Sequence, residues 1–243
     1  SETVREPNPK AERQEETEVA KMSKHVVIDL EMCNVPSSAK RVFGCKHEII
    51  QIGAALIDEN VEVVDTFNTY VKPEYGCLDD FIMNLTGISW SELSDAPHLE
   101  EALMGFLNWL PDEEVTIVSW SMTDKTQLLK EMEAKGIAIL RIDEMFGDWL
   151  DCQPMFSEKL GNNRRYRLSE ALVAADIPYE GTAHNGLNDA YNTALLFAKM
   201  STDQVFTLNP YYEAARSDNA PKPLCTTIGD LFAGMDFSKL AIA

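Results

Sequence analysis

The sequence predicts an α/β domain in which helices flank a mixed, five-stranded sheet. A short apolar run at 25–31, HVVIDLE, contains the β-branched residues of a buried strand. Two further strands, at 48–58 and 62–72, are joined by a short polar turn that is typical of an antiparallel hairpin. Helical patterns then alternate with strand-like runs, and this order indicates a sheet with helices packed on it.

The later elements follow from the spacing of apolar residues. Residues 97–110 carry apolar side chains on one helical face, and 115–120, VTIVSW, have the composition of a fourth buried strand. Residues 124–135 form a second helical pattern that ends at Gly136, a residue that often terminates helices. The pattern then predicts a fifth strand within 147–152 and two helices, at 167–175 and 188–200.

The two ends of the chain differ in composition from the middle. Residues 1–23 are polar and rich in Glu, which predicts a flexible tail with a frayed helix over 11–21. We expect one domain over 24–200 and a C-terminal extension over 201–243 that packs back on the domain or meets a partner. A protein partner or a homodimer formed through these extensions is therefore an expectation.

Composition excludes several classes of protein. Hydrophobic residues make up 45% of the 243 residues, which is enough for a substantial core. No apolar run approaches the roughly 20 residues that span a bilayer, and the charged N-terminus lacks the apolar stretch of a secretory signal. The five cysteines are scattered and form no CxxC pair. These features predict a protein of the reducing cytoplasm without a membrane span.

The net charge has two interpretations. The chain carries 21 Lys and Arg against 40 Asp and Glu, a formal charge of −19. Such a body repels polyanions at long range, which argues against a nucleic-acid-binding protein. A protein that holds several divalent cations has the same kind of composition. Both interpretations stay open at this point.

Two carboxylates in the first strand are unusual. Asp29 and Glu31 are two residues apart, so their side chains point to the same face of a strand that is otherwise apolar. Burying them together costs several kcal/mol unless a cation compensates. A strand end that has emerged into solvent explains the pair equally well.

Two further aspartates and a histidine lie near the starts of predicted helices. Asp124 opens a helix directly after the fourth strand, and His184 precedes Asp189 by five residues at the start of the last helix. Each aspartate alone is an ordinary helix N-cap, and a lone loop histidine is usually a surface residue. Together, however, these positions converge at one edge of the predicted sheet. Four carboxylates at one place need compensation, and Mg²⁺ or Mn²⁺ suits oxygen ligands of this kind.

This set of residues resembles the DEDDh group of 3′–5′ exonucleases, which have a ribonuclease-H-like fold. The resemblance covers roughly 25–200 and includes the segments EIIQIGAALID, LTGI at 85–88 and SWSMTD at 119–124. The Trp120-x3-Asp124 spacing is most similar to the branch that contains histone-mRNA and small-interfering-RNA exonucleases and sporulation-inhibitor-type proteins. His184, five residues before the last aspartate, indicates the histidine group rather than the tyrosine group.

The resemblance implies a mechanism with two metal ions. Asp29 would bridge both ions, Glu31 and Asp189 would help hold the first, and Asp124 would support the site. His184 would act as general base on the attacking water, since an imidazole titrates near neutral pH. Nucleoside 5′-monophosphates would then leave from a 3′ end.

Substrate contacts are predicted at two kinds of position. Leu30, Met32 and Thr86 occupy places where the family touches the terminal nucleotide, although plain packing explains each of them. Two basic stretches offer phosphate contacts: 161–167, with Arg164, Arg165 and Tyr166, and 40–47, with Phe43. In either stretch the aromatic ring, Tyr166 or Phe43, would stack on a base, and a solvated basic loop explains each stretch equally well.

The resulting hypothesis is a metal-dependent 3′–5′ exonuclease that favours RNA. A DNA-directed exonuclease shares every catalytic residue, so the motifs do not separate the two. A non-catalytic adaptor and an ordinary acidic domain are further alternatives, but five filled positions in the right order disfavour both. From the net charge we expect weak binding of long nucleic acid and distributive action on short or flexible 3′ ends.

Overall fold

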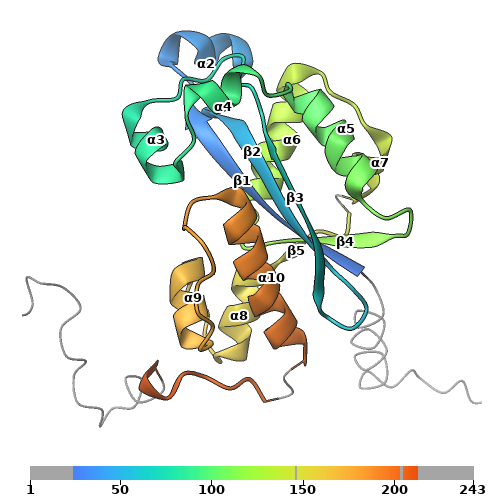
Figure 1. Ribbon diagram of the computed structural model, residues 1–243, viewed down its shortest axis with the longest axis vertical. Coiled ribbons are helices and arrows are strands. Elements are labelled where there is room, and N and C mark those ends of the chain that lie inside the picture. The colour runs from blue at the N-terminus through green and yellow to red at the C-terminus, as the bar shows by residue number, and fades with distance from the viewer. Residues whose placement is uncertain (1–23, 146, 203–204, 213–243) are drawn as a thin grey trace, which may run out of the picture.

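The computed structural model describes residues 24–145, 147–202 and 205–212 (Figure 1). Its sheet has the order β3-β2-β1-β4-β5. The pairs β1–β2 and β2–β3 are antiparallel, whereas β4 pairs parallel to β1 and β5 pairs parallel to β4. This arrangement confirms the mixed, five-stranded sheet and the antiparallel hairpin. The strands are β1 (Lys24–Asn34), β2 (His47–Ile57), β3 (Val63–Tyr70), β4 (Val115–Ser119) and β5 (Leu150–Asp151).

The four helices that the sequence predicts between 97 and 200 are all present, at α5, α6, α9 and α10. Five other helices, of five to eight residues, were not predicted, because they show no clear apolar period. Local capping defines some of them: in α3, for example, the side chain of Asp79 accepts a hydrogen bond from the backbone N–H of Ile82. The helices are α2 (Ser37–Phe43), α3 (Asp80–Thr86), α4 (Trp90–Ser94), α5 (Leu99–Trp109), α6 (Thr123–Lys135), α7 (Leu140–Met145), α8 (Cys152–Lys159), α9 (Leu168–Ala174) and α10 (Gly186–Thr202).

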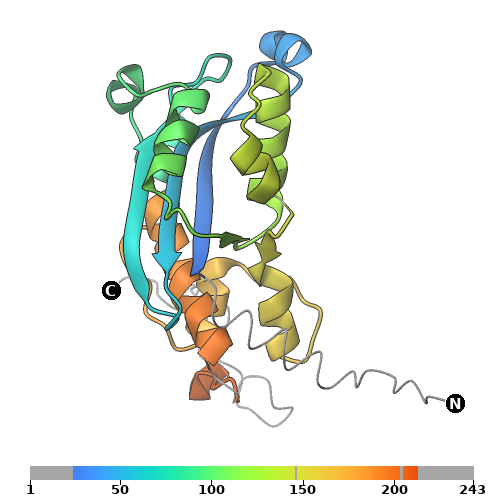
Figure 2. The same ribbon diagram turned by 90° about the vertical axis from the view of Figure 1, so that its right-hand side faces the viewer.

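The two faces of the sheet carry different helices. Val26, Ile28 and Leu30 of β1 are buried in a cluster with residues of α5, α6 and α7. Val27, which points the other way, belongs to a cluster built by α8, α9 and α10. Both views place the first group of helices in the upper half of the molecule and the second group in the lower half (Figure 1 and Figure 2). By strand alternation, Asp29 therefore lies on the α10 face.

The described part of the C-terminal extension packs back on the domain. Phe206, Leu208 and Tyr212 lie against the α8–α10 cluster, and the backbone N–H of Asn209 donates to the carbonyl of Ala174 at 2.9 Å. The predicted tail over 1–23, with its frayed helix, and the segment 213–243 lie outside the described residues. Among the residues described, no helix is long and apolar enough to cross a membrane.

Candidate active site

The β1 carboxylates face the start of α10. Asp29 pairs with Gly53 across the sheet, and Glu31 pairs with Gln51. Gly53 contacts the backbone of α10, which identifies the face that these pairs share. The register between β1 and β2 shifts just after Glu31, and such β-bulges often occur beside active sites. The strand thus presents two half-buried carboxylates to the helix instead of to open solvent.

Two glycines allow the start of α10 to approach the sheet. A Cβ atom built on Gly53 would lie 2.1 Å from the carbonyl carbon of Gly186, the first residue of the helix. The fully buried side chain of Gln51 fixes this contact, because its Oε1 accepts a hydrogen bond from the N–H of Gly186 at 3.0 Å. The helix therefore begins directly against β1 and β2, next to the two carboxylates.

The turn before α10 holds His184 and Asp189 together. His184 has a left-handed backbone conformation, with φ of 61°, and its N–H donates to Oδ2 of Asp189 at 2.9 Å. The hydroxyl of Tyr179 donates a hydrogen bond to the other oxygen, Oδ1. Glu31, His184 and Asp189 each place one possible ligand atom within 4.8 Å of the others. Elements far apart in sequence thus meet at one point, as the sequence predicted for these three residues.

Asp124 joins the site from α6. It lies in the first turn of that helix and is only 7% exposed. Its Oδ1 accepts a hydrogen bond from the backbone N–H of Leu30 at 3.2 Å, between the two β1 carboxylates. The N-cap of α6 is Met122 instead. Asp124 is therefore no ordinary helix cap: it attaches the helix to β1, between Asp29 and Glu31.

Burial is the largest cause of the raised pKa values in the site, and repulsion between the carboxylates adds to it at Asp29, Glu31 and Asp124. Burial, followed by the charges of Asp189 and Asp124, raises the pKa of Glu31 to about 8. Burial likewise raises the pKa of Asp124 to about 7, although the hydrogen bond from Leu30 opposes the shift. Burial and the neighbouring carboxylates hold the pKa of Asp29 well above its usual range, and burial raises that of Asp189.

The donor set fits hard divalent cations. The ion pairs of Lys24, Lys135 and Arg164 are all formed with carboxylates outside this set of four. Carboxylate oxygens crowded in this way are the ligands that Mg²⁺ and Mn²⁺ prefer, and a bound cation removes the repulsion that raises the pKa values. Asp29, Glu31, Asp124 and Asp189 form the candidate metal centre.

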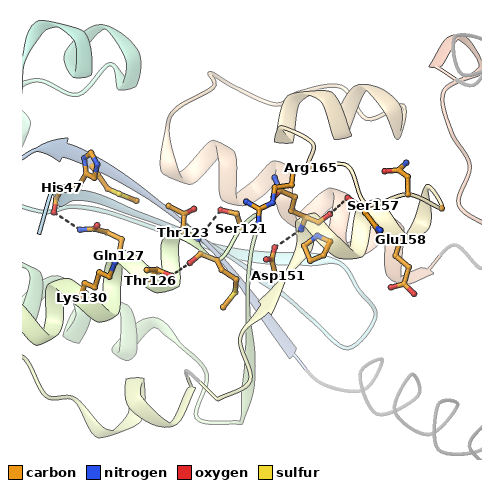
Figure 3. Close-up of a pocket in the computed structure, with 17 residues that line it drawn as sticks. His47, Ser121, Thr123, Thr126, Gln127, Lys130, Asp151, Ser157, Glu158 and Arg165 are labelled. Carbon is orange, nitrogen blue, oxygen red and sulfur yellow. Dashed lines mark hydrogen bonds between the residues drawn. The ribbon is translucent and has the colours of Figure 1, made fainter.

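A cavity of about 1010 Å³ is lined by residues that are adjacent in sequence to two of these carboxylates (Figure 3). Met32, the residue after Glu31, lines it, as do the three residues that precede Asp124. Arg165 also lines the cavity. Arg164 does not: its guanidinium forms an ion pair with Glu170 at 3.0 Å and stacks on the ring of Tyr166.

The other predicted substrate contacts have less access. Leu30 is 5% exposed and packs in the core, while the hydroxyl of Thr86 donates to the carbonyl of Ile82 and accepts from the N–H of Ile88. The rings of Phe43 and Tyr166 are each 3% exposed. Stacking of a base on either ring, which the sequence suggested, is therefore wrong: Phe43 stacks on Tyr75, and Tyr166 packs against Phe156.

Several residues at the site were not identified from the sequence. Tyr179 and Gln51 orient Asp189 and the start of α10, and Lys130 and His47 line the cavity. Gln51 gave a signal as an amide within the apolar run of β2, and His47 ends the basic stretch 40–47. Tyr179 and Lys130 lie in segments whose composition is ordinary.

Known proteins are similar in sequence to the region that holds the site. Residues 26–197 match the model of the exonuclease family, RNase_T. ERI1 exoribonuclease 2 of Xenopus laevis is 30% identical over 181 residues, which cover 64% of this chain and 26% of that protein. The 3′-5′ exoribonuclease 1 of Rattus norvegicus is 25% identical over 169 residues, covering 65% of this chain and 48% of the relative. The chain thus spans about a quarter to a half of the length of these relatives.

Solved structures show the same fold. A 3′-exonuclease described in 3′-end-specific recognition of histone mRNA stem-loop superposes with a TM-score of 0.65 at 20% identity, over 82% of this chain and 73% of that one. The Mg²⁺- and Mn²⁺-bound form of S. pombe Pop2p has a TM-score of 0.56 at 19% identity, over 84% and 93%. The ribonuclease-H-like fold predicted from the sequence is confirmed. Taken with the match over 26–197, the convergent carboxylates and the histidine at α10, this shows that the chain belongs to the exonuclease (RNase_T) family.

Proposed function

We propose that this chain is a metal-dependent 3′–5′ exoribonuclease that releases nucleoside 5′-monophosphates from single-stranded or short 3′ ends. The observation that carries the proposal is the meeting of Asp29 and Glu31 with His184 and Asp189 at the start of α10, with Asp124 attached to β1 from α6. The names of the relatives, which are exoribonucleases, favour RNA over DNA.

Two Mg²⁺ or Mn²⁺ ions would be held by Asp29, Glu31, Asp124 and Asp189. When bound, these ions supply positive charge that stabilises the developing charges on the scissile phosphate and on the leaving 3′ oxygen. The protein contributes the placement of the oxygens. Tyr179 and the N–H of His184 orient Asp189, and the N–H of Leu30 orients Asp124.

His184 would accept a proton from the attacking water at a ring nitrogen. Its side chain is exposed, so water reaches the ring, and a ring nitrogen lies within 4.8 Å of a carboxylate oxygen of Glu31 and of Asp189. An imidazole suits this role at physiological pH.

Met32 and Arg165 are the predicted contacts that the cavity favours. Met32 is half-buried beside the catalytic carboxylates, where its thioether can pack on the face of a base. Arg165 can neutralise a phosphate from the far side of the cavity. Leu30, Thr86 and Arg164 act, in this proposal, through the packing and hydrogen bonds that support the site.

The compartment we propose is the reducing cytoplasm. The cysteines that the structure describes, Cys33, Cys45, Cys77 and Cys152, are all free thiols. Free thiols are typical of a reducing environment.

The proposal is tested with 5′-labelled single-stranded RNA and the matching DNA. Each substrate is incubated with Mn²⁺, with Mg²⁺ and with chelator. We expect a ladder that shortens from the 3′ end, requires metal and passes through all intermediate lengths, as distributive action does. His184→Ala should abolish the ladder, while His98→Ala, which alters an exposed histidine at the start of α5, should not.

Each outcome decides between named alternatives. Faster cleavage of DNA than of RNA would support a DNA-directed exonuclease instead. No cleavage of either strand, with calorimetry showing no metal binding, would mean that the constellation is not catalytic. Processive digestion of a long strand at physiological salt would contradict the distributive part of the proposal.

A further inference from the structure

The cavity beside the metal centre has two walls that come from different parts of the chain. His47, Gln127 and Lys130 form one end, where β2 begins beside α6 (Figure 3). Arg165 lies toward the other end, with α8 and the segment 161–165. Thr123, the residue before Asp124, lies between these ends. The cavity therefore runs past the first turn of α6, from the start of β2 to α8 and the segment 161–165.

The wall that carries Arg165 is rigidly attached. The indole N–H of Trp120 donates to the carbonyl of Tyr166 at 3.2 Å, and Nε2 of Gln153 donates to the same oxygen at 2.7 Å. The hydroxyl of Ser157 donates to the carbonyl of Arg164. These bonds hold the backbone on both sides of Arg165 while its side chain stays exposed. The guanidinium thus reaches the cavity from a backbone segment that hydrogen bonds hold in place.

The opposite wall is also preformed. Nε2 of Gln127 donates to the carbonyl of His47 at 2.9 Å, and the thiol of Cys45 donates to the carbonyl of Lys130 at 3.6 Å. Lys130 itself is exposed. Within the described residues, neither the ammonium of Lys130 nor the guanidinium of Arg165 forms a hydrogen bond or an ion pair. Both cations are available to a ligand.

The charge of the cavity differs from that of the molecule. Lys130 and Arg165 balance Asp151 and Glu158, the two carboxylates that line the cavity, so its formal charge is zero with His47 neutral. The whole chain carries −19. A polyanion is therefore repelled less here than over the average surface. Apolar groups are present as well, and those of Met32, Met122 and Pro154 suit the faces of bases.

We propose that this cavity holds the nucleotides immediately upstream of the scissile bond, with Lys130 and Arg165 contacting phosphates from opposite walls. Its volume of about 1010 Å³ lies at the upper end of the range for small-ligand pockets, which leaves room for more than one nucleotide. The inference rests on the proposed exoribonuclease function. It adds a binding site that makes the enzyme depend on an unpaired stretch of RNA behind the 3′ end.

Salt dependence of RNA binding tests the site directly. The full chain with His184→Ala, which keeps the RNA intact, is titrated in Mg²⁺ into fluorescein-labelled single-stranded RNA across a series of KCl concentrations. Each phosphate contact on a single strand contributes about 0.7 to the slope of log K against log salt. Lys130→Ala and Arg165→Ala should each reduce the slope by about 0.7, and the double variant by about 1.4.

Matched variants separate the cavity from general charge. Lys40 and Arg41 lie on α2, in the basic stretch 40–47 that the sequence offered as a second phosphate site, and neither lines the cavity. Because the cavity carries the strand in this proposal, Lys40→Ala and Arg41→Ala should leave the slope unchanged. Lys130→Arg and Arg165→Lys keep the charge and should retain most of the slope. All of these positions are exposed, so the variants should unfold at the same temperature as the parent.

The outcomes distinguish this inference from the proposed function. If the cavity variants bind RNA with an unchanged slope while the chain with His184 intact degrades RNA from the 3′ end, the upstream site is wrong and the function stands. A slope that falls in the α2 variants instead would place the strand on α2 and also overturn the site. If the intact chain cleaves nothing but its binding depends on Lys130 and Arg165, the site stands and the catalytic proposal fails.

Discussion

Asp189 is held by two donors of different origin. The hydroxyl of Tyr179 bonds to Oδ1, and the backbone N–H of His184 bonds to Oδ2. Tyr179 therefore fixes the rotation of the carboxylate relative to Glu31, whose possible ligand atom lies within 4.8 Å. Residues that orient metal ligands in this way contribute to metal affinity without touching the metal.

Tyr179→Phe should weaken Mn²⁺ binding and cleavage by about 10–100-fold, because the carboxylate loses the donor that orients it. Calorimetric titration of Mn²⁺ measures the first effect, and the rate of RNA shortening measures the second. Tyr70→Phe is a matched control, since the Tyr70 hydroxyl also bonds to a carboxylate, Glu92, outside the site. Equal Mn²⁺ affinity in the Tyr179 variant and the parent would contradict this role.

The sequence predicts carboxylates better than it predicts their supports. Asp29 and Glu31 stand out because charges are out of place in an apolar strand, and Asp124 follows a strand of the same kind. Tyr179 is a common residue in an ordinary loop, so nothing local reveals its bond to Asp189. The amide of Gln51 reaches Gly186, which is 135 residues away, and such a contact exists only once the sheet and α10 are assembled.

At the scale of elements, the contact between α10 and β2 sets the geometry of the site. Gly53→Ala would place a methyl group 2.1–2.3 Å from backbone atoms of Gly186 and Leu187, which cannot yield as a flexible side chain would. We expect a loss of about 1–3 kcal/mol in the free energy of unfolding. Cleavage should fall further than stability explains, because the displaced helix carries Asp189. Urea unfolding and the RNA assay at a temperature well below the midpoint measure the two effects.

Gly105→Ala provides the contrasting glycine. Gly105 is exposed within α5, and a Cβ there would meet only the ring edge of Phe67 at 4.0 Å. Alanine should stabilise the helix by about 0.5–1 kcal/mol and leave cleavage unchanged. If both alanine variants behaved alike, close approach of α10 to β2 would not be the cause.

A buried cluster of ion pairs attaches α6 to the start of β2. Nζ of Lys135 lies 2.8 Å from Glu48 and 3.1 Å from Glu131, and both carboxylates are fully buried. Glu48 also accepts backbone N–H groups of the segment 74–76, while Glu131 accepts the N–H of Ile49. One lysine thus joins the end of α6, the start of β2 and the loop that follows β3.

Lys135→Met should destabilise the protein by about 3–5 kcal/mol, because it leaves buried carboxylates without their cation. Part of the loss should be recovered at lower pH, where Glu131, whose pKa burial already raises, takes up a proton. Lys24→Met is the control: Lys24 pairs with Glu59 and Glu113 at the surface, so the denaturation midpoint should change little. A small effect at Lys135 as well would show that the cluster relaxes into solvent.

The elements differ in how well their sequences predict them. The long strands β1 and β2 and the helices α5, α6 and α10 follow from apolar period, because each buries a continuous face. The fifth strand, expected within 147–152, is reduced to Leu150–Asp151, since Asp151 already caps α8. Helices of five to eight residues, such as α4 and α8, are set by caps and tertiary packing that no periodic pattern records.

At the scale of the whole molecule, the net charge of −19 and the burial of the carboxylates both favour protonation of the metal-free folded state. At the same pH, the folded protein therefore binds protons that the unfolded chain releases. Glu31 has a pKa of about 8 in the fold against 4.5 ordinarily, and Asp124 about 7 against 3.8. Between these limits the folded state binds more protons than the unfolded state, so the free energy of unfolding falls as pH rises.

We therefore expect the midpoint of thermal unfolding in chelator to fall by several degrees between pH 5 and pH 8, since about 1 kcal/mol corresponds to 2–4 °C for a chain of this size. Mn²⁺ should reverse this trend, because cations bind the deprotonated carboxylates and compete with protons at low pH. Glu31→Gln removes one of the titrating groups and should flatten the chelator profile, whereas general repulsion from the net charge would leave its slope unchanged. A stabilisation by Mn²⁺ that is as large at pH 5 as at pH 8 would show that these carboxylates are ionised in the metal-free fold, and that the repulsion among them is relieved by something other than protons.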